Sequence, residues 1–191
     1  MHVVEVHYYD QPGVQNTNDV LEVSSKRARQ LGVTQVVVAS THGGTALRAR
    51  EVFAEDTRIV AVTISAAFER EGWIMSDSER RAVSGAGVQV LTAMHSLGDD
   101  VSEAMVGQGW PPNRMVRETL YRFSQGMKVA IEVALMAAEA GMLDMSADVI
   151  AIGGTDSGAD TALLLKPAYA RDFRTLKIRE ILAMPRRLCS G

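Results

Sequence analysis

The sequence contains one cysteine, Cys189, and it lies close to the C-terminal end. A chain with a single cysteine has no internal disulfide framework, and we expect a protein of the reducing cytoplasm. No apolar run approaches the roughly 18 residues of a membrane-spanning helix, and residues 1–7 lack the charged and apolar regions of a signal peptide. A membrane is therefore not an expected partner.

Several other signals are also missing. The net charge is −3, and no basic block precedes the C-terminal region, so a nucleic acid is not expected as a partner. No spacing of His, Cys and carboxylate residues matches a known metal site, so no metal is predicted. No Gly-x-Ser-x-Gly motif is present. With 47% hydrophobic and 23% charged residues, the 191-residue chain is expected to form one domain over residues 1–191.

Residues 35–46 are the most informative stretch. Residues 36–39 are apolar and predict a strand buried on both faces, and residues 46–51 are good helix formers. Between them lies a loop of small and polar residues: Ser40, Thr41, His42, Gly43, Gly44 and Thr45. A strand, such a loop and a helix N-terminus together make a site for an anion, because free N–H groups and hydroxyls gather there. The alternative is an ordinary strand–helix turn capped by Ser or Thr.

The first half of the chain alternates strands and helices. A helix over about 16–31 precedes the strand at 36–39, and a helix over about 46–53 precedes a predicted strand at 58–63. A further strand is predicted at 88–92. A third helix starts at a capping box, in which Ser76 is followed three residues later by Glu79, and reaches about residue 83. This alternation indicates an α/β fold with a parallel sheet. Residues 3–9 are a possible edge strand.

The second half begins with a connection of roughly 55 residues, which is too long to be a plain loop. A short helix is predicted at residues 100–105 and a long one over 114–140, kinked near 124–126 and buried from 127 to 138. A strand at 148–152 leads into a second small-residue loop, at 153–161. Residues 161–166 fit a short helix or an antiparallel strand, and residues 178–183 predict a last strand.

Three runs resemble the C-terminal α/β domain of pyruvate kinase: residues 36–46, 59–63 and 153–161. The chain more closely resembles a group of small archaeal and bacterial proteins of unassigned role that consist of this domain alone. Residues 16–17, 92–95 and 125–129 and the loop at 153 are similar to theirs, so the resemblance covers nearly the whole chain.

The resemblance implies a three-layer α/β/α sandwich with a mostly parallel five-stranded sheet of order 3-2-1-4-5. Strand 5 is antiparallel in that fold, which assigns residues 161–166 to a strand. The two loops then follow strands 1 and 4, on either side of the topological switch point where open α/β sheets bind ligands.

The resemblance also implies a ligand. The two loops hold a phosphorylated sugar in pyruvate kinase, and in the stand-alone group the resemblance points to flavin mononucleotide (FMN). The expected binding residues are Ser40, Thr41, His42, Gly43, Gly44, Thr45, Thr63, His95, Gly154, Thr155, Asp156, Ser157, Gly158 and Asp160. Asp156 and Asp160 are either acceptors for ligand hydroxyls or turn residues that bond their own backbone. His42 and His95 are either ligand contacts or solvated loop residues.

Two functions remain open at this point. One is a binding or regulatory module for a phosphorylated small molecule, without pyruvate kinase activity because the catalytic barrel is missing. The other is a flavin-dependent oxidoreductase. Lys128 and Glu132, four residues apart, are either a partly exposed ion pair or a pair facing the site. A homo-oligomer is expected, because residues 114–140 are more apolar than a sheet flank should cover and Trp110 and Met115 lie near their start.

Overall fold

The computed structural model describes residue 1 and residues 3–186, so Cys189 lies outside the described residues. Its strands are β1 (His7–Tyr9), β2 (Gln35–Ala39), β3 (Arg58–Thr63), β4 (Gln89–Thr92), β5 (Val149–Gly153), β6 (Thr161–Lys166) and β7 (Lys177–Pro185). Its helices are α1 (Thr17–Leu31), α2 (Gly44–Val52), α3 (Asp77–Gly85), α4 (Val101–Val106), α5 (Pro112–Leu120) and α6 (Gln125–Glu139). Three short 3-10 helices are η1 (Val14–Asn16), η2 (Ala66–Glu71) and η3 (Ala170–Thr175). None of the helices in the described ranges is long and apolar enough to cross a membrane.

All strands form one mixed sheet of seven strands in the order β1-β7-β6-β5-β2-β3-β4. The prediction of a five-stranded sheet is therefore wrong in strand count and in overall order. The five expected strands are β4, β3, β2, β5 and β6, which are consecutive neighbours, and β6 is antiparallel to β5 as expected. Two further strands extend the sheet, because β7 pairs with the far side of β6 and β1 pairs with β7. The sheet extends beyond β6 because all residues of β6 except Lys166 are buried. An apolar strand of this kind at the open edge of a sheet would be prone to pair with another chain.

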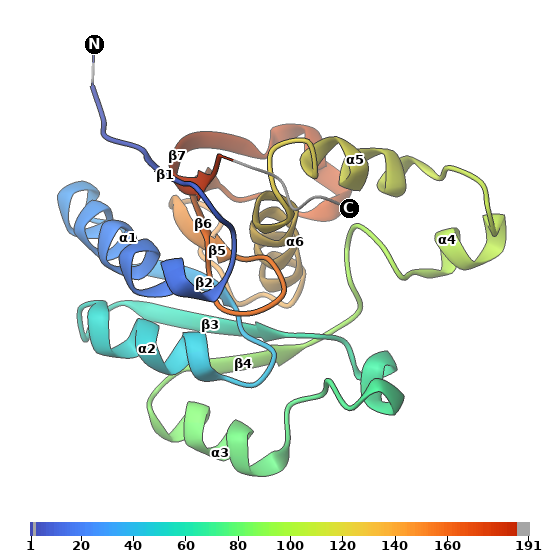
Figure 1. The fold of residues 1–191 in the computed structure, drawn as a ribbon, viewed down its shortest axis with the longest axis horizontal. Coiled ribbons are helices and arrows are strands. Elements are labelled where there is room, and N and C mark those ends of the chain that lie inside the picture. Colours follow the sequence, from blue (N-terminus) through green and yellow to red (C-terminus); the bar gives the residue numbers. More distant parts are fainter. Residues whose placement is uncertain (2, 187–191) are drawn as a thin grey trace.

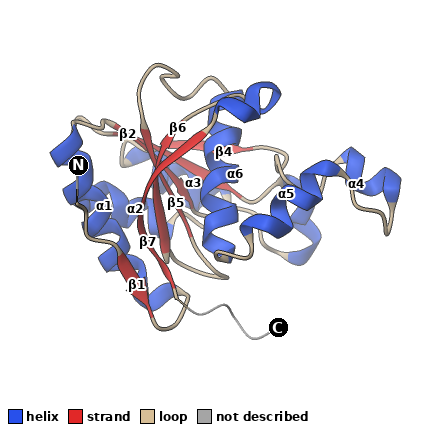
Figure 2. Ribbon diagram, turned by 90° about the horizontal axis from the view of Figure 1, so that it is seen from above, coloured by secondary structure: helices blue, strands red, loops and turns tan. Residues whose placement is uncertain are grey.

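Helices cover both faces of the sheet (Figures 1 and 2). Apolar side chains of α1, α2 and α3 pack on one face, and those of α6, with part of α5, pack on the other. A hydrophobic core lies on each face of the sheet, and the strand β2 contributes to both of them. Val36 and Val38 point into one core and Val37 points into the other. This central position explains why β2 reads as a continuous apolar run in the sequence.

Residues 114–140 do not form one kinked helix, so that prediction is wrong. The chain leaves helical geometry at Ser124, which has an extended backbone. The Ser124 hydroxyl accepts a hydrogen bond from Met127 N at 2.8 Å and so caps the N-terminus of α6. Two residues later, a Cβ at Gly126 would lie 2.3 Å from Thr161 Oγ1. The break therefore lets α6 start directly against the beginning of β6.

Helices α4 and α5 form an arm that extends away from the sheet (Figures 1 and 2). The expected reason for self-association is wrong, because the sheet buries nearly all of α6. Exposed apolar side chains are instead found on the arm and just before α5: Val101, Met105, Val106, Trp110 and Met115. Clusters of this kind are typical of contact surfaces between proteins.

Self-association remains a prediction, and the arm is the surface that we now expect to mediate it. We expect light scattering at micromolar concentration to give a dimer or a higher even-numbered assembly, and the double substitution M105E/W110E to shift the mass toward 20.7 kDa, the mass of one chain. Leu31→Glu, at an exposed apolar residue of α1 on the other side of the sheet from the arm (Figures 1 and 2), is the control and should leave the assembly intact. A mass near 20.7 kDa for the unmodified protein would contradict this prediction.

Candidate functional site

The first loop leads into the N-terminus of α2, where the N-cap residue, Gly43, has no side chain that could cap the helix. Gly43 has a φ of 85°, and a Cβ there would lie 2.4 Å from Val83 Cγ2, so the loop packs against α3 only with glycine at this position. Ala46 N donates to Ser40 Oγ at 3.2 Å, which satisfies one amide of the first turn of α2. The amides of Gly44 and Thr45 have no acceptor within the described part of the chain. The positive end of α2 is therefore available to an anion.

The second loop is held by Asp160, which is completely buried. Its Oδ2 accepts hydrogen bonds from Gly13 N at 3.0 Å and Thr155 N at 3.1 Å, and its Oδ1 accepts one from Thr161 Oγ1 at 2.8 Å. Both carboxylate oxygens are thus used inside the protein. The structure places Asp160 behind the loop as a support and not at the surface that a ligand would touch.

The start of α1 closes the second loop from the other side. Thr17 Oγ1 accepts a hydrogen bond from Ala159 N at 2.9 Å and donates one to Val14 O at 2.7 Å. Gly158 has a φ of 74°, and a Cβ there would lie 2.4 Å from Thr17 Oγ1. This close approach brings the N-terminus of α1 next to the two loops.

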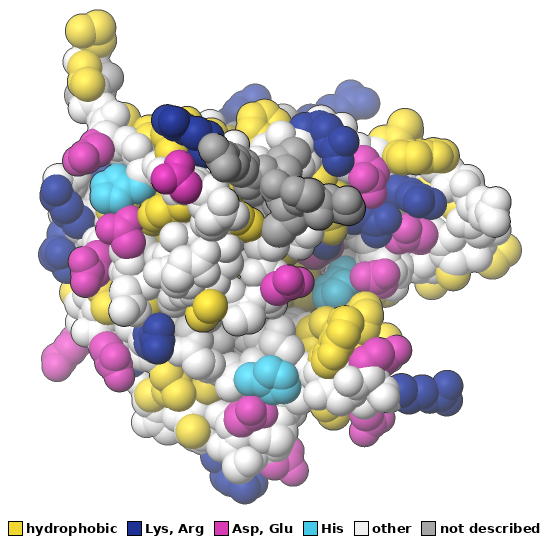
Figure 3. Space-filling view, viewed as in Figure 1, with side chains coloured by type: hydrophobic (Ala, Val, Ile, Leu, Met, Phe, Trp, Pro, Cys, Tyr) yellow, Lys and Arg dark blue, Asp and Glu magenta, His cyan; other side chains and the backbone are white. Residues whose placement is uncertain are grey.

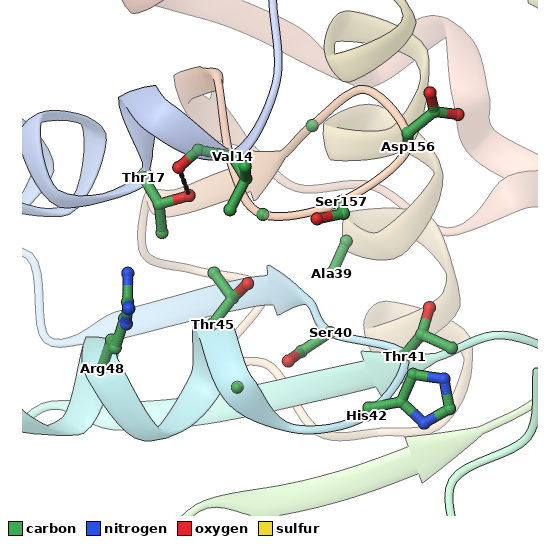
Figure 4. Close-up of a pocket in the computed structure, with 13 residues that line it drawn as sticks. Val14, Thr17, Ala39, Ser40, Thr41, His42, Thr45, Arg48, Asp156 and Ser157 are labelled. Carbon is green, nitrogen blue, oxygen red and sulfur yellow. Dashed lines mark hydrogen bonds between the residues drawn. The ribbon is translucent and has the colours of Figure 1, made fainter.

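These three segments enclose a cavity of about 370 Å³ (Figure 4). Known small-molecule sites span about 300–1,000 Å³, so the cavity has room for a ligand of modest size. It is lined by Val14, Thr17, Ala39, Ser40, Thr41, His42, Gly44, Thr45, Arg48, Gly154, Asp156, Ser157 and Gly158.

Most of the expected site residues line this cavity. Those at its surface are Ser40, Thr41, His42, Gly44, Thr45, Gly154, Asp156, Ser157 and Gly158. Those that do not line it are Gly43, Thr63, His95, Thr155 and Asp160. The Thr63 hydroxyl lies 2.6 Å from that of Thr92 at the ends of β3 and β4, and His95 lies in the loop that follows β4.

The cavity is also lined by four residues that were not among the expected binding residues: Val14, Thr17, Ala39 and Arg48. The position of Arg48 carried a usable signal, because a residue four positions after Gly44 lies one helical turn along the same face of α2. Its guanidinium donates to Asn18 Oδ1 at 3.1 Å and forms no ion pair with a described residue. No local signal marks Val14 and Thr17, since tertiary packing brings α1 to the loops.

The charges at the two ends of the cavity differ. Figure 4 shows Arg48 at one end and Asp156, Thr41 and His42 at the other. Asp156 has a φ of 57° and its carboxylate makes no hydrogen bond with a described residue. His42 Nδ1 lies 3.3 Å from Glu79 Oε1. The backbone N–H and hydroxyl of Ser76 lower the pKa of Glu79, and His42 lowers it further.

The ion pair of Lys128 and Glu132 is buried, so the expectation of partial exposure is wrong. Their Nζ and Oε2 atoms lie 2.5 Å apart, and Glu132 Oε1 accepts a hydrogen bond from Leu97 N at 2.9 Å. Neither residue lines the cavity. The pair instead fastens the loop after β4 to α6.

No group of three or more His, Cys, Asp or Glu side chains suited to a metal ion occurs within the described ranges. No protein-family model matches the chain.

The role of Asp160 can be tested by Asp160→Asn. The amide carries no charge and has one acceptor oxygen where the carboxylate has two, so the buried hydrogen bonds from Gly13 N, Thr155 N and the Thr161 hydroxyl become weaker or must rearrange. We expect the free energy of unfolding to fall by about 2–3 kcal/mol in urea denaturation. The matched control is Asp156→Asn, because asparagine tolerates positive φ and this side chain is exposed. A loss of stability in the control as large as in Asp160→Asn would contradict the assignment of Asp160 as the support.

Proposed function

We propose that the protein binds a phosphorylated small ligand in the cavity between the two loops, and that this ligand is FMN. The observation that carries the proposal is the pair of unbonded amides, Gly44 and Thr45, at the start of α2 in the wall of the cavity. Amides at a helix N-terminus bind phosphate through direct hydrogen bonds and through the helix dipole.

The surrounding groups fit a phosphate. Arg48 supplies an unpaired positive charge, and the hydroxyls of Thr45 and Ser157 supply further donors. A Cβ built on Gly44 would have no protein atom within 4 Å, so the space beside this backbone is open to a ligand. Asp156 lies at the opposite end from Arg48 (Figure 4). A phosphate near Arg48 would therefore leave Asp156 to accept hydrogen bonds from ligand hydroxyls.

The choice of FMN comes from the resemblance to the stand-alone pyruvate kinase C-terminal-like proteins. The five consecutive strands β6-β5-β2-β3-β4 support that resemblance. The ribityl hydroxyls of FMN suit Asp156 and Ser157, and its phosphate suits Gly44, Thr45 and Arg48. A bound flavin supplies electron or hydride transfer, while the residues of the cavity hold and orient it.

Anaerobic mixing of the FMN-loaded protein with a pyridine nucleotide distinguishes the two candidate functions. The flavin of an oxidoreductase is reduced by the nucleotide, whereas the flavin of a binding or regulatory module is not.

Gly44→Val tests the proposal. The new side chain would fill the space beside the amides, so we expect isothermal titration calorimetry to show a loss of FMN affinity of about 100-fold or more, as expected for a lost phosphate site. The fold should be kept, because Gly44 has no positive φ and no protein atom near its Cβ position.

The matched control is Gly85→Val. Gly85 also has ordinary backbone geometry and open space at its Cβ position, and it lies at the end of α3 outside the cavity lining. This variant should bind FMN like the unmodified protein. A folded Gly44→Val variant with full affinity would exclude the α2 N-terminus as the binding site.

A further inference from the structure

A cluster of aromatic rings is formed by residues that follow β3 and β4 in the chain. The Phe68 ring stacks on Trp73 with centroids 5.7 Å apart and planes 10° apart, and it also lies 5.7 Å from the His95 ring. Trp73 is 51% exposed, although the Phe68 ring stacks against it. The cluster therefore presents a flat apolar face to its surroundings.

The histidine of this cluster is held in one orientation. His95 Nδ1 lies 2.9 Å from Asp99 Oδ2, and only 15% of its side chain is exposed. Its other ring nitrogen, Nε2, has no hydrogen-bond partner among the described residues. A carboxylate on one nitrogen fixes the tautomer and the direction of the other. His95 thus offers one oriented polar atom at the edge of the aromatic face.

The loop that carries His95 is braced by three contacts. Leu97 N donates to Glu132 Oε1 and Asp99 N donates to Glu103 Oε2, both at 2.9 Å. A Cβ at Gly98 would lie 2.4 Å from Arg117 Nη1, so the loop packs closely on α5. Asp99 has a φ of 55°, an uncommon backbone conformation for a residue other than glycine. Strained and braced loops of this kind are found at functional sites.

We propose that Trp73, Phe68 and His95 form the subsite for the heteroaromatic ring of the phosphorylated ligand, an inference that rests on the proposed function. Neighbouring strands lie about 4.8 Å apart, so the end of β4 is roughly 10 Å from the end of β2. The ribityl chain of FMN separates its ring from its phosphate. A phosphate at the start of α2 therefore leaves the ring free to extend along the edge of the sheet.

The direction of the cavity agrees with this placement. In Figure 4 the ends of β3 and β4 lie on the same side as Thr41 and His42, away from Arg48. Figure 3 shows that the surface is indented on this side, between the arm and the part of the molecule that lies below the arm in this view. A flavin ring has an apolar face and hydrogen-bonding edges, which match the exposed Trp73 face and His95 Nε2.

The experiment compares two probes, FMN and ribitol 5-phosphate, which lacks the ring. Trp73→Leu should lower FMN affinity about tenfold through lost stacking, and His95→Leu about fivefold through one lost hydrogen bond. The affinity for ribitol 5-phosphate should not change in either variant.

The matched controls are Trp110→Leu, at an exposed tryptophan of the arm, and His7→Leu, at a histidine that is likewise held by a carboxylate, Asp19. Both controls should bind both probes normally.

Each other outcome overturns the inference in a distinguishable way. Unchanged FMN affinity in folded Trp73→Leu and His95→Leu variants excludes the ring subsite, while a loss of binding in Gly44→Val still supports the phosphate site. An equal loss for both probes shows that these residues act on the phosphate site and not on the ring. No FMN binding by the unmodified protein overturns both the ring subsite and the proposed function.

Discussion

The candidate site depends on the buried carboxylate of Asp160. It accepts hydrogen bonds from Gly13 N, Thr155 N and the Thr161 hydroxyl, and that hydroxyl lies 3.1 Å from Ser124 Oγ, which caps α6. One side chain therefore ties together the turn before α1, the loop between β5 and β6, and the N-terminus of α6. A buried charge is tolerated only when hydrogen bonds replace its lost hydration, and here each replacement positions a different part of the site.

The topology then decides where the cavity opens. Strands β2 and β5 are parallel neighbours, but β2 continues into α2 on one face, whereas β5 turns back through a loop into β6. The chain thus diverges at the ends of two adjacent strands and leaves a crevice between them. The glycines at 43 and 158 allow α3 and α1 to approach the loops closely, which narrows the crevice into a cavity. The amides of α2 and the side chain of Arg48 make the surroundings favourable for an anion.

Local signals in the sequence predicted the elements well. The apolar run at 36–39 and the capping box at Ser76 each depend on neighbouring residues, and each is present in the structure. Strands were predicted at residues 3–9 and 178–183, where β1 and β7 lie, but their addition to the sheet beside β6 was missed, because it depends on pairing between distant segments. The sequence likewise could not show that Asp160 faces inward or that α1 supplies Thr17 to the cavity. These outcomes depend on tertiary packing.

In the proposed binding mode, the start of α2 holds the phosphate of the ligand. A crystal structure of the protein with FMN tests it most directly. We expect phosphate oxygens within hydrogen-bonding distance of the Gly44 and Thr45 amides and close to the guanidinium of Arg48. A phosphate bound elsewhere on the protein, with these two amides in contact only with water, would contradict the account.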